Sequence, residues 1–209
     1  MSGEFGENCV RGNADSYIKI NPERGNPRLL LHSCCGPCST SVIERLAPHY
    51  RITVFYYNPC ITEEEEYIRR RENQKAFIEA FNANSSFEPI SFLEGDYTPE
   101  EYLSKVKGLE QEPEGGARCH VCFRQRLEET AKTAKDMEMD LFTTTLTVSP
   151  HKNYEVISNI AKELAGIYDI EFLDMDFKKK AGFQRSIQLS KEYGLYRQDY
   201  CGCNFSKRD

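Results

Sequence analysis

Short apolar runs alternate along the chain with longer segments in which apolar residues recur every three or four positions. Five of the short runs are rich in β-branched or aromatic residues and are predicted to be strands: Arg28–His32, Ile52–Tyr57, Phe87–Leu93, Asp140–Thr145 and Ile170–Leu173. Helical patterns separate them, and strands that alternate with helices form parallel sheets with helices on both faces. The pattern therefore predicts an α/β fold with a five-stranded parallel sheet and helices on both faces.

Sequence signals also mark where several helices begin. Pro37 suits the first turn of a helix after the first strand, because a proline there loses no hydrogen bond. Thr62 and Glu65 have the spacing of a capping box, which predicts a helix that runs to about Phe81. Further helices are predicted after Thr98, after Cys119, from Pro150 to Gly166, and over residues 182–193.

The helix predicted after Thr62 has an unusually polar middle. Residues 69–75 contain no apolar side chain over two turns. A solvated face is the simplest interpretation. A helix that passes beneath a polar site would show the same pattern, so both interpretations stay open.

The chain length of 209 residues suits a single domain. Residues 1–27 are polar and lack an apolar period, so we predict an irregular N-terminal arm followed by one α/β domain over residues 28–209. No apolar run approaches the ~20 residues that span a bilayer. The first residues also lack the basic-then-apolar pattern of a signal peptide. We therefore expect a cytoplasmic protein with no membrane partner.

Seven of the nine cysteines lie in three tight clusters, about eighty residues apart. Closely spaced thiols hold soft metals, and cysteines in a reducing compartment indicate metal binding or catalysis rather than disulfides. We therefore expect residues 28–209 to form a metal-binding catalytic domain. The predicted metal ligands are Cys34, Cys35, Cys38, Cys119, Cys122, Cys201 and Cys203.

The number of thiols limits the kind of site. An iron–sulfur cluster or a structural zinc takes four thiolates, so seven thiols suggest one site of four and an adjacent role for three. Cys34 and Cys35 are adjacent, and on an extended backbone they would point to opposite sides and serve neighbouring centres. The pattern favours iron–sulfur, with structural zinc as the alternative. Cys9 and Cys60 stand alone and are interpreted as small hydrophobic residues.

A Cys-Gly-Pro-Cys sequence between a strand and a helix also resembles the thioredoxin redox motif. Cys34 directly before it and the two further cysteine clusters count against that interpretation.

Charge is unevenly distributed, although the formal net charge is −6. Residues 93–116 are acidic, and residues 178–209 hold eight bases against three acids. His151 and Lys152 open a predicted helix at the same edge of the sheet, an arrangement that suits an anion and equally a simple helix cap. The charge pattern is compatible with a local anionic partner and equally with a solvated face.

Several uncommon motifs occur together and in one order: LLLHSCCGPCST, FYYNPCITEEEEYIRRRENQ, EGDYTPEEY, VKGLEQEPEGGARCHVCFRQRLEETA, FTTTLTVSPHKN and FKKKAGFQRSIQLSKEYGLYRQDYCGC. Over residues 28–205 the chain resembles the cobalamin-independent epoxyqueuosine reductases of the queuosine tRNA-modification pathway. The seven clustered cysteines match the pattern of that family. Cys60 departs from it, since we expect a residue other than cysteine there.

The resemblance implies a fold related to adenine-nucleotide hydrolase-like and PP-loop domains. Cysteines replace the loop that holds ATP in those domains, so ATP use is not expected. It also implies a [4Fe–4S] cluster with an adjacent mononuclear iron. The implied reaction removes the epoxide oxygen of epoxyqueuosine at the tRNA wobble position as water, in a two-electron step. The implied partners are a tRNA anticodon stem-loop that carries epoxyqueuosine and an external electron donor of the ferredoxin or flavodoxin type.

Individual residues are assigned to this chemistry as hypotheses. Proton donors or residues that position the leaving oxygen are sought among His151, Asp199 and Tyr200. Tyr57 is a candidate for stacking on the splayed base. The candidates for phosphate contacts are Arg118, Arg124, Lys152, Lys179, Lys180, Arg185 and Arg197.

Two other functions are compatible with parts of the pattern. A cluster-dependent tRNA sulfur-transfer enzyme would share the fold, but it would retain a pyrophosphate loop and hydrolyse ATP. A zinc-stabilised RNA-binding protein would contain zinc and lack the visible absorbance of an iron–sulfur centre.

Overall fold

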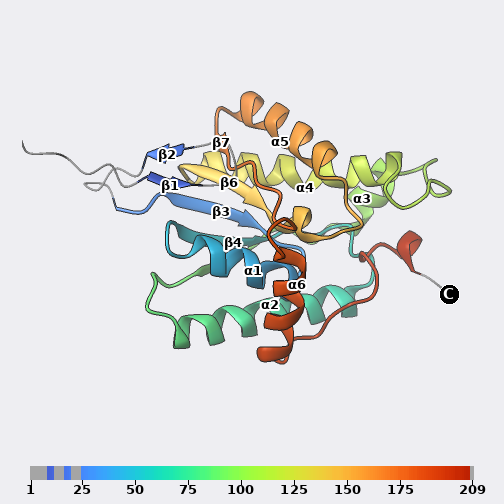
Figure 1. Cartoon of the computed structure of the whole chain (residues 1–209). Coiled ribbons are helices and arrows are strands. Elements are labelled where there is room, and N and C mark those ends of the chain that lie inside the picture. Colours follow the sequence, from blue (N-terminus) through green and yellow to red (C-terminus); the bar gives the residue numbers. More distant parts are fainter. Residues whose placement is uncertain (1–8, 12–16, 20–24, 208–209) are drawn as a thin grey trace, which may run out of the picture.

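Five parallel strands form the central sheet (Figure 1). The computed structural model describes residues 9–11, 17–19 and 25–207. The strands β3 (Arg28–His32), β4 (Arg51–Tyr56), β5 (Ser91–Glu94), β6 (Leu141–Thr144) and β7 (Glu171–Phe172) lie in the order β5-β4-β3-β6-β7. Every neighbouring pair is parallel. The predicted α/β fold and its five-stranded parallel sheet are confirmed.

Helices cover both faces of this sheet (Figure 1). The helices α1 (Gly36–Leu46), α2 (Glu64–Asn84) and α6 (Gly182–Glu192) lie on one face, and α4 (Ala117–Asp136) and α5 (Tyr154–Tyr168) lie on the other.

The central strand β3 contributes to both halves of the core. Successive side chains of a strand point to opposite faces. Leu29 and Leu31 belong to the hydrophobic cluster on the α1 side, whereas Leu30 belongs to the cluster on the α4 side. All three side chains are fully buried. This explains why the first strand reads as an uninterrupted apolar run rather than an alternating one.

The described residues also form three short helices. They are α3 (Pro99–Lys105) and the 3₁₀ helices η1 (Thr145–Val148) and η2 (Asn204–Ser206). Within the described parts of the chain, no helix combines the length and the apolar character that crossing a bilayer requires.

The N-terminal segment contains one regular feature. The strands β1 (Cys9–Arg11) and β2 (Tyr17–Lys19) pair antiparallel, with Cys9 opposite Lys19. The other positions of residues 1–24 lie outside the described residues, so the irregular arm over residues 1–27 stays a prediction.

Two predicted helix starts are wrong. Thr62 does not cap α2, which begins at Glu64; its hydroxyl instead accepts a hydrogen bond from the backbone N–H of Asn204, at 3.3 Å. The helix expected from Pro150 begins at Tyr154, because the side chain of Asn153 accepts the free N–H groups of its first turn. For α2, a tertiary contact uses the predicted cap residue, and for α5 a better N-cap lies further along the chain.

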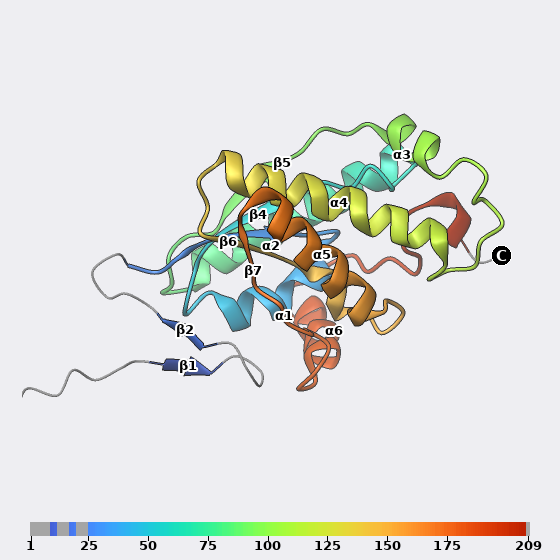
Figure 2. The ribbon, with the colours of Figure 1, turned by 90° about the horizontal axis from the view of Figure 1, so that it is seen from above.

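The order of the strands determines where the cysteine loops meet. The chain builds from β3 outward through β4 to β5, and then returns to the other side of β3 for β6 and β7. Ligands of such sheets bind beyond the carboxyl ends of the strands, at the point where the order reverses. Residues 33–38 leave β3 at this point. Figure 2 shows that the C-terminal segment reaches the same end of the molecule, beside the first turn of α4.

Candidate metal centre

Three thiols gather on the loop that leaves β3. The Sγ atoms of Cys34, Cys35 and Cys38 all lie within 4.8 Å of one another, close enough to bind a single metal ion. The Sγ atoms of Cys34 and Cys35 are 3.9 Å apart, so the prediction that these side chains diverge is wrong. The reason is that the strand has ended before these residues. Cys35 is the N-cap of α1, and Cys38 lies in the first turn of that helix.

The surroundings of this group favour negative charge on sulfur. The free N–H groups at the start of α1 stabilise a thiolate. Hydrogen bonding with Cys35 and Cys38 lowers the pKa of Cys34 well below its usual range, and Lys152 adds to this effect. The same coupling raises the pKa of Cys35 to about 11, because one negative charge in the group disfavours a second.

One side chain reaches this group from the far end of the chain. The amide Nε2 of Gln198 donates a hydrogen bond to Cys35 Sγ, at 3.0 Å. Hydrogen bonds to the sulfurs are among the factors that set the reduction potential of an iron–sulfur centre. Gln198 was not among the residues that the sequence singled out, since a lone glutamine in a loop carries no local signal.

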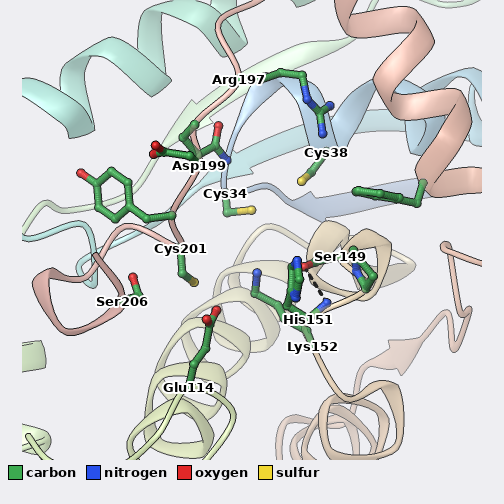
Figure 3. A pocket seen from close by; sticks show the side chains of 14 residues that line it. Cys34, Cys38, Glu114, Ser149, His151, Lys152, Arg197, Asp199, Cys201 and Ser206 are labelled. Carbon is green, nitrogen blue, oxygen red and sulfur yellow. Dashed lines mark hydrogen bonds between the residues drawn. The ribbon is translucent and has the colours of Figure 1, made fainter. Parts of the chain in front are cut away.

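A cavity of about 200 Å³ opens beside the three thiols. Its lining includes Cys34, Cys38 and Cys201 together with all three proton-donor candidates, His151, Asp199 and Tyr200. Figure 3 shows Cys34 and Cys38 on one side of the cavity, with His151, Lys152 and Glu114 on the opposite side. The structure therefore brings clustered sulfurs, a cation and proton-bearing groups to one space. Arg197 also lines this cavity.

Five cysteines line a second, smaller cavity, and four of them do not line the first. Its lining contains Cys60, Cys119, Cys122, Cys201 and Cys203. Cys201 lines both cavities, as do Glu114 and Ser206, so the two spaces are neighbours.

The two groups of thiols differ in how tightly they gather. Among the described residues, only Cys34, Cys35 and Cys38 meet the 4.8 Å limit. Six of the seven predicted ligands line the two cavities, with Cys201 in both, and Cys60 joins the second group. Cys35 lies with Cys34 and Cys38 but is not part of either lining. Cys60 does pack in a hydrophobic cluster, as interpreted from the sequence, but that interpretation left it out of the predicted ligands. The position of Cys60 just after β4, at the same edge of the sheet, was the signal available.

Two buried arginines lie behind the sulfurs. Arg70 of α2 is 1% exposed and donates to Glu66 Oε1 at 2.6 Å and to the carbonyl of Cys201 at 2.9 Å. Arg126 of α4 is also 1% exposed. Burial disfavours its charge, but Cys122, Cys60 and other neighbouring sulfurs outweigh burial and raise its pKa.

The polar middle of α2 is explained by this arrangement. Arg70 and Gln74 are buried and hold the site loops, since Gln74 accepts a hydrogen bond from Ser33 at 2.7 Å. By contrast, Arg71 and Lys75 form ion pairs at the surface. The helix passes beneath the polar site on one side and is solvated on the other.

Two of the predicted RNA contacts are buried. Arg118 is 1% exposed, and its Nη1 donates to three backbone carbonyls of the loop before α4, at 2.6–3.1 Å. Tyr57 is stacked against Phe55 and is also buried. In this structure Arg118 stabilises a loop and Tyr57 packs in the core, so neither faces an RNA surface.

The other basic candidates differ in how available their charges are. Arg124 and Arg185 each form an ion pair with a glutamate of a neighbouring helix. Lys179 and Lys180 are exposed. Lys152 is partly exposed at the cavity; desolvation opposes its charge, but the sulfurs of Cys201, Cys34 and Cys38 raise its pKa.

Comparison with known proteins identifies the family. The family model described as epoxyqueuosine reductase QueH matches residues 29–209. The chain belongs to this family. It is 43% identical over 186 residues to the epoxyqueuosine reductase QueH of Streptococcus pyogenes serotype M1, covering 89% of this chain and 72% of the relative. It is 36% identical over 181 residues to the protein of that name from Thermotoga maritima, covering 85% and 89% of the two chains.

A solved structure shares the fold. The U34-tRNA thiolase NcsA from Methanococcus maripaludis, solved with its [4Fe–4S] cluster, superimposes with a TM-score of 0.51 at 12% sequence identity. The match covers 88% of this chain and 62% of the thiolase chain. The likeness to a PP-loop-like enzyme agrees with the predicted fold relationship.

Proposed function

We propose that this chain reduces epoxyqueuosine to queuosine in tRNA and carries a [4Fe–4S] cluster and an adjacent iron on its clustered cysteines. The epoxide gains two electrons and two protons, both C–O bonds break, and the products are an alkene and water. The observation that carries the proposal is the Cys34–Cys35–Cys38 group, which opens into a cavity lined by proton-bearing and cationic side chains. Membership of the QueH family supports the same substrate.

The donor set fits an iron–sulfur centre. Three soft thiols lie together at a helix N-terminus, and Cys201 lines the same cavity as a fourth. The buried Arg126 and the partly exposed Lys152 compensate the negative charge of thiolates. When bound, such a centre supplies single electrons and an iron that acts as a Lewis acid.

The side chains around the cavity supply the protons. Burial raises the pKa of Tyr200, so its phenol keeps a proton that it can donate at Oη. His151 and Asp199 line the same cavity and are exposed, which lets them exchange protons with water. The ammonium group of Lys152 stays protonated beside the sulfurs and stabilises negative charge on the leaving oxygen.

The basic residues near the cavity suit the phosphates of an anticodon loop. Arg197 lines the cavity and is exposed, and Lys179 and Lys180 are exposed on the segment before α6. A local basic surface binds a polyanion even when the whole chain is acidic. The electrons come from an external donor of the ferredoxin or flavodoxin type.

The test combines metal analysis with a tRNA assay. Protein purified and reconstituted without oxygen is analysed for iron and sulfide, and then incubated with epoxyqueuosine tRNA and a chemical reductant. Mass spectrometry of tRNA digests should show epoxyqueuosine converted to queuosine, with no requirement for ATP. Cys38→Ser should lose both iron and turnover. An active preparation that contains zinc as its only metal would refute the redox mechanism, and sulfur incorporation that consumes ATP would favour a sulfur-transfer enzyme.

A further inference from the structure

The side chain of Cys60 faces the second group of thiols. Cys60 lies in the turn that follows β4, where the N–H of Ile61 bonds to the carbonyl of Asn58 at 3.1 Å. It is 2% exposed and belongs to a small hydrophobic cluster together with Cys122 and Cys203. The packing of the core therefore fixes the position of the Cys60 side chain.

Three separate elements bring thiols to this place. Cys60 comes from the β4–α2 loop, Cys119 and Cys122 from the start of α4, and Cys203 from the C-terminal loop. A CxxC pair at a helix start presents both sulfurs to one ion, and two more thiols from other loops complete the four that soft-metal sites take. The cavity that they surround is small and lined on one side by Tyr102 and Phe123, so it does not suit an organic substrate.

A buried cation beside these thiols indicates that the site is anionic. Arg126 is 1% exposed, and its Nε makes a long hydrogen bond of 3.4 Å to the carbonyl of Cys122. Its Nη2 is buried, and within the described part of the chain it has no hydrogen-bond partner. A guanidinium in such a position is costly unless negative charge lies beside it.

We propose that Cys60 is the fourth thiolate ligand of a second metal site, formed with Cys119, Cys122 and Cys203 and compensated by Arg126. This assignment rests on the proposed function only in that both assume soft-metal binding. It changes the count of thiols from seven to eight. The chain then holds two sets of four, and the other set consists of the group Cys34, Cys35 and Cys38 together with Cys201, which lines both cavities.

The competing explanation is that Cys60 only packs in the core. A valine fills similar apolar space and cannot bind metal, whereas a serine keeps the shape and is a poor soft-metal ligand. Cys60→Val and Cys60→Ser therefore separate packing from ligation. Ile61→Val is the matched control, because Ile61 is its buried neighbour in the same turn and this change keeps every thiol.

The experiment uses the full chain, stripped of metal and reduced, and cadmium ions as the probe. Binding is measured by competition with a chromophoric chelator, and folding by circular dichroism. Both Cys60 variants should bind cadmium at one site at least ~10–100-fold more weakly, a loss typical even of changes beyond the direct ligands. Ile61→Val should bind as the wild type does. Wild-type affinity at every site in Cys60→Val would overturn the assignment.

A second measurement decides the question if the Cys60 variants do not fold. NMR of the cadmium-loaded wild-type protein detects coupling between the metal and the β-protons of each cysteine that binds it. Coupling to Cys60 supports the assignment, and coupling to Cys119, Cys122 and Cys203 without Cys60 overturns it. Cadmium binding does not require turnover. If cadmium binds Cys60 but the separately reconstituted, iron-loaded protein does not reduce epoxyqueuosine, the proposed function is refuted and this inference still stands.

Discussion

The buried ion pair between Arg70 and Glu66 holds the C-terminal loop against α2, and its removal should damage both the fold and the metal site. Arg70 also donates to the carbonyls of Tyr200 and Cys201, at 3.3 and 2.9 Å. Tyr196 of the same loop donates to Glu66 Oε2 at 3.2 Å. These contacts join a loop that carries two of the thiols to a helix more than 100 residues earlier.

The expected cost follows from what Arg70→Met leaves behind. The carboxylate of Glu66, 8% exposed, loses its cation, and two carbonyls lose their donor. Breaking a buried ion pair by removing one partner costs about 3–5 kcal/mol. Against a typical total stability of about 5–15 kcal/mol, the variant still folds but is close to the threshold. Glu66→Gln in the same chain removes the unpaired charge, so the double variant should be more stable than Arg70→Met alone.

Urea unfolding of the reduced, metal-free protein measures the free energy of unfolding. The iron or cadmium content after reconstitution shows whether the metal site is intact. The control is Arg71→Met, because Arg71 forms its ion pairs at the surface with Glu72 and Glu94. That change should cost no more than about 1 kcal/mol and leave the metal content unchanged. The role given to the Arg70–Glu66 ion pair is refuted if Arg70→Met lowers the free energy of unfolding no more than Arg71→Met does, or if it retains the wild-type metal content.

Three further predictions concern the site. Gln198→Leu removes the hydrogen-bond donor to Cys35 Sγ. Because a net hydrogen bond contributes about 0.5–1.5 kcal/mol, the reduction potential of the iron-loaded protein should fall by roughly 20–60 mV in a potentiometric titration. An unchanged potential contradicts this. Arg197→Gln should reduce the salt dependence of tRNA binding by about one unit of log–log slope, whereas Arg185→Gln, paired with Glu44, should not; equal slopes would exclude Arg197 from the interface. Burial lowers the pKa of His32 from 6.5 to about 3 in the folded protein. As the pH falls from 6.5 toward 3, the unfolded chain is therefore protonated at this histidine while the folded chain is not. The free energy of unfolding of the metal-free protein should decrease by about 1.4 kcal/mol per pH unit from this group over that range. The stability difference between wild type and His32→Gln should therefore shrink below pH 6.5, and parallel curves would refute it.

The architecture was accessible from the sequence because its signals are local. A buried strand such as β3 reads as an apolar run, and α6 was predicted over residues 182–193 and observed over Gly182–Glu192. Element boundaries were less accessible where tertiary contacts decide them. Thr62 has the residue type and spacing of a cap, but in the folded chain its hydroxyl is used by the C-terminal loop.

The site was accessible only where residues repeat a recognisable spacing. The CxxC and CxC pairs can be recognised from their spacing, and the loop after β3 identifies the edge of the sheet where they meet. No spacing in the sequence relates Gln198 to Cys35 or Cys60 to Cys122, because these contacts depend on how distant loops fold together. Arg118 illustrates the opposite error: a basic residue beside a metal ligand suggested an RNA contact, but its charge is used by three carbonyls inside the protein.

The C-terminal loop has a consequence for how the protein is made. Cys201 and Cys203 follow Cys34 by more than 160 residues along the chain. During synthesis the early thiols emerge long before their partners, and domains with such distant contacts complete their folding late. Metal that met the chain before Cys201 and Cys203 had emerged would therefore find only part of the proposed ligands. A chain that ends prematurely, even a few residues before residue 201, would keep most of its hydrophobic core but lack the thiols that complete both cavities.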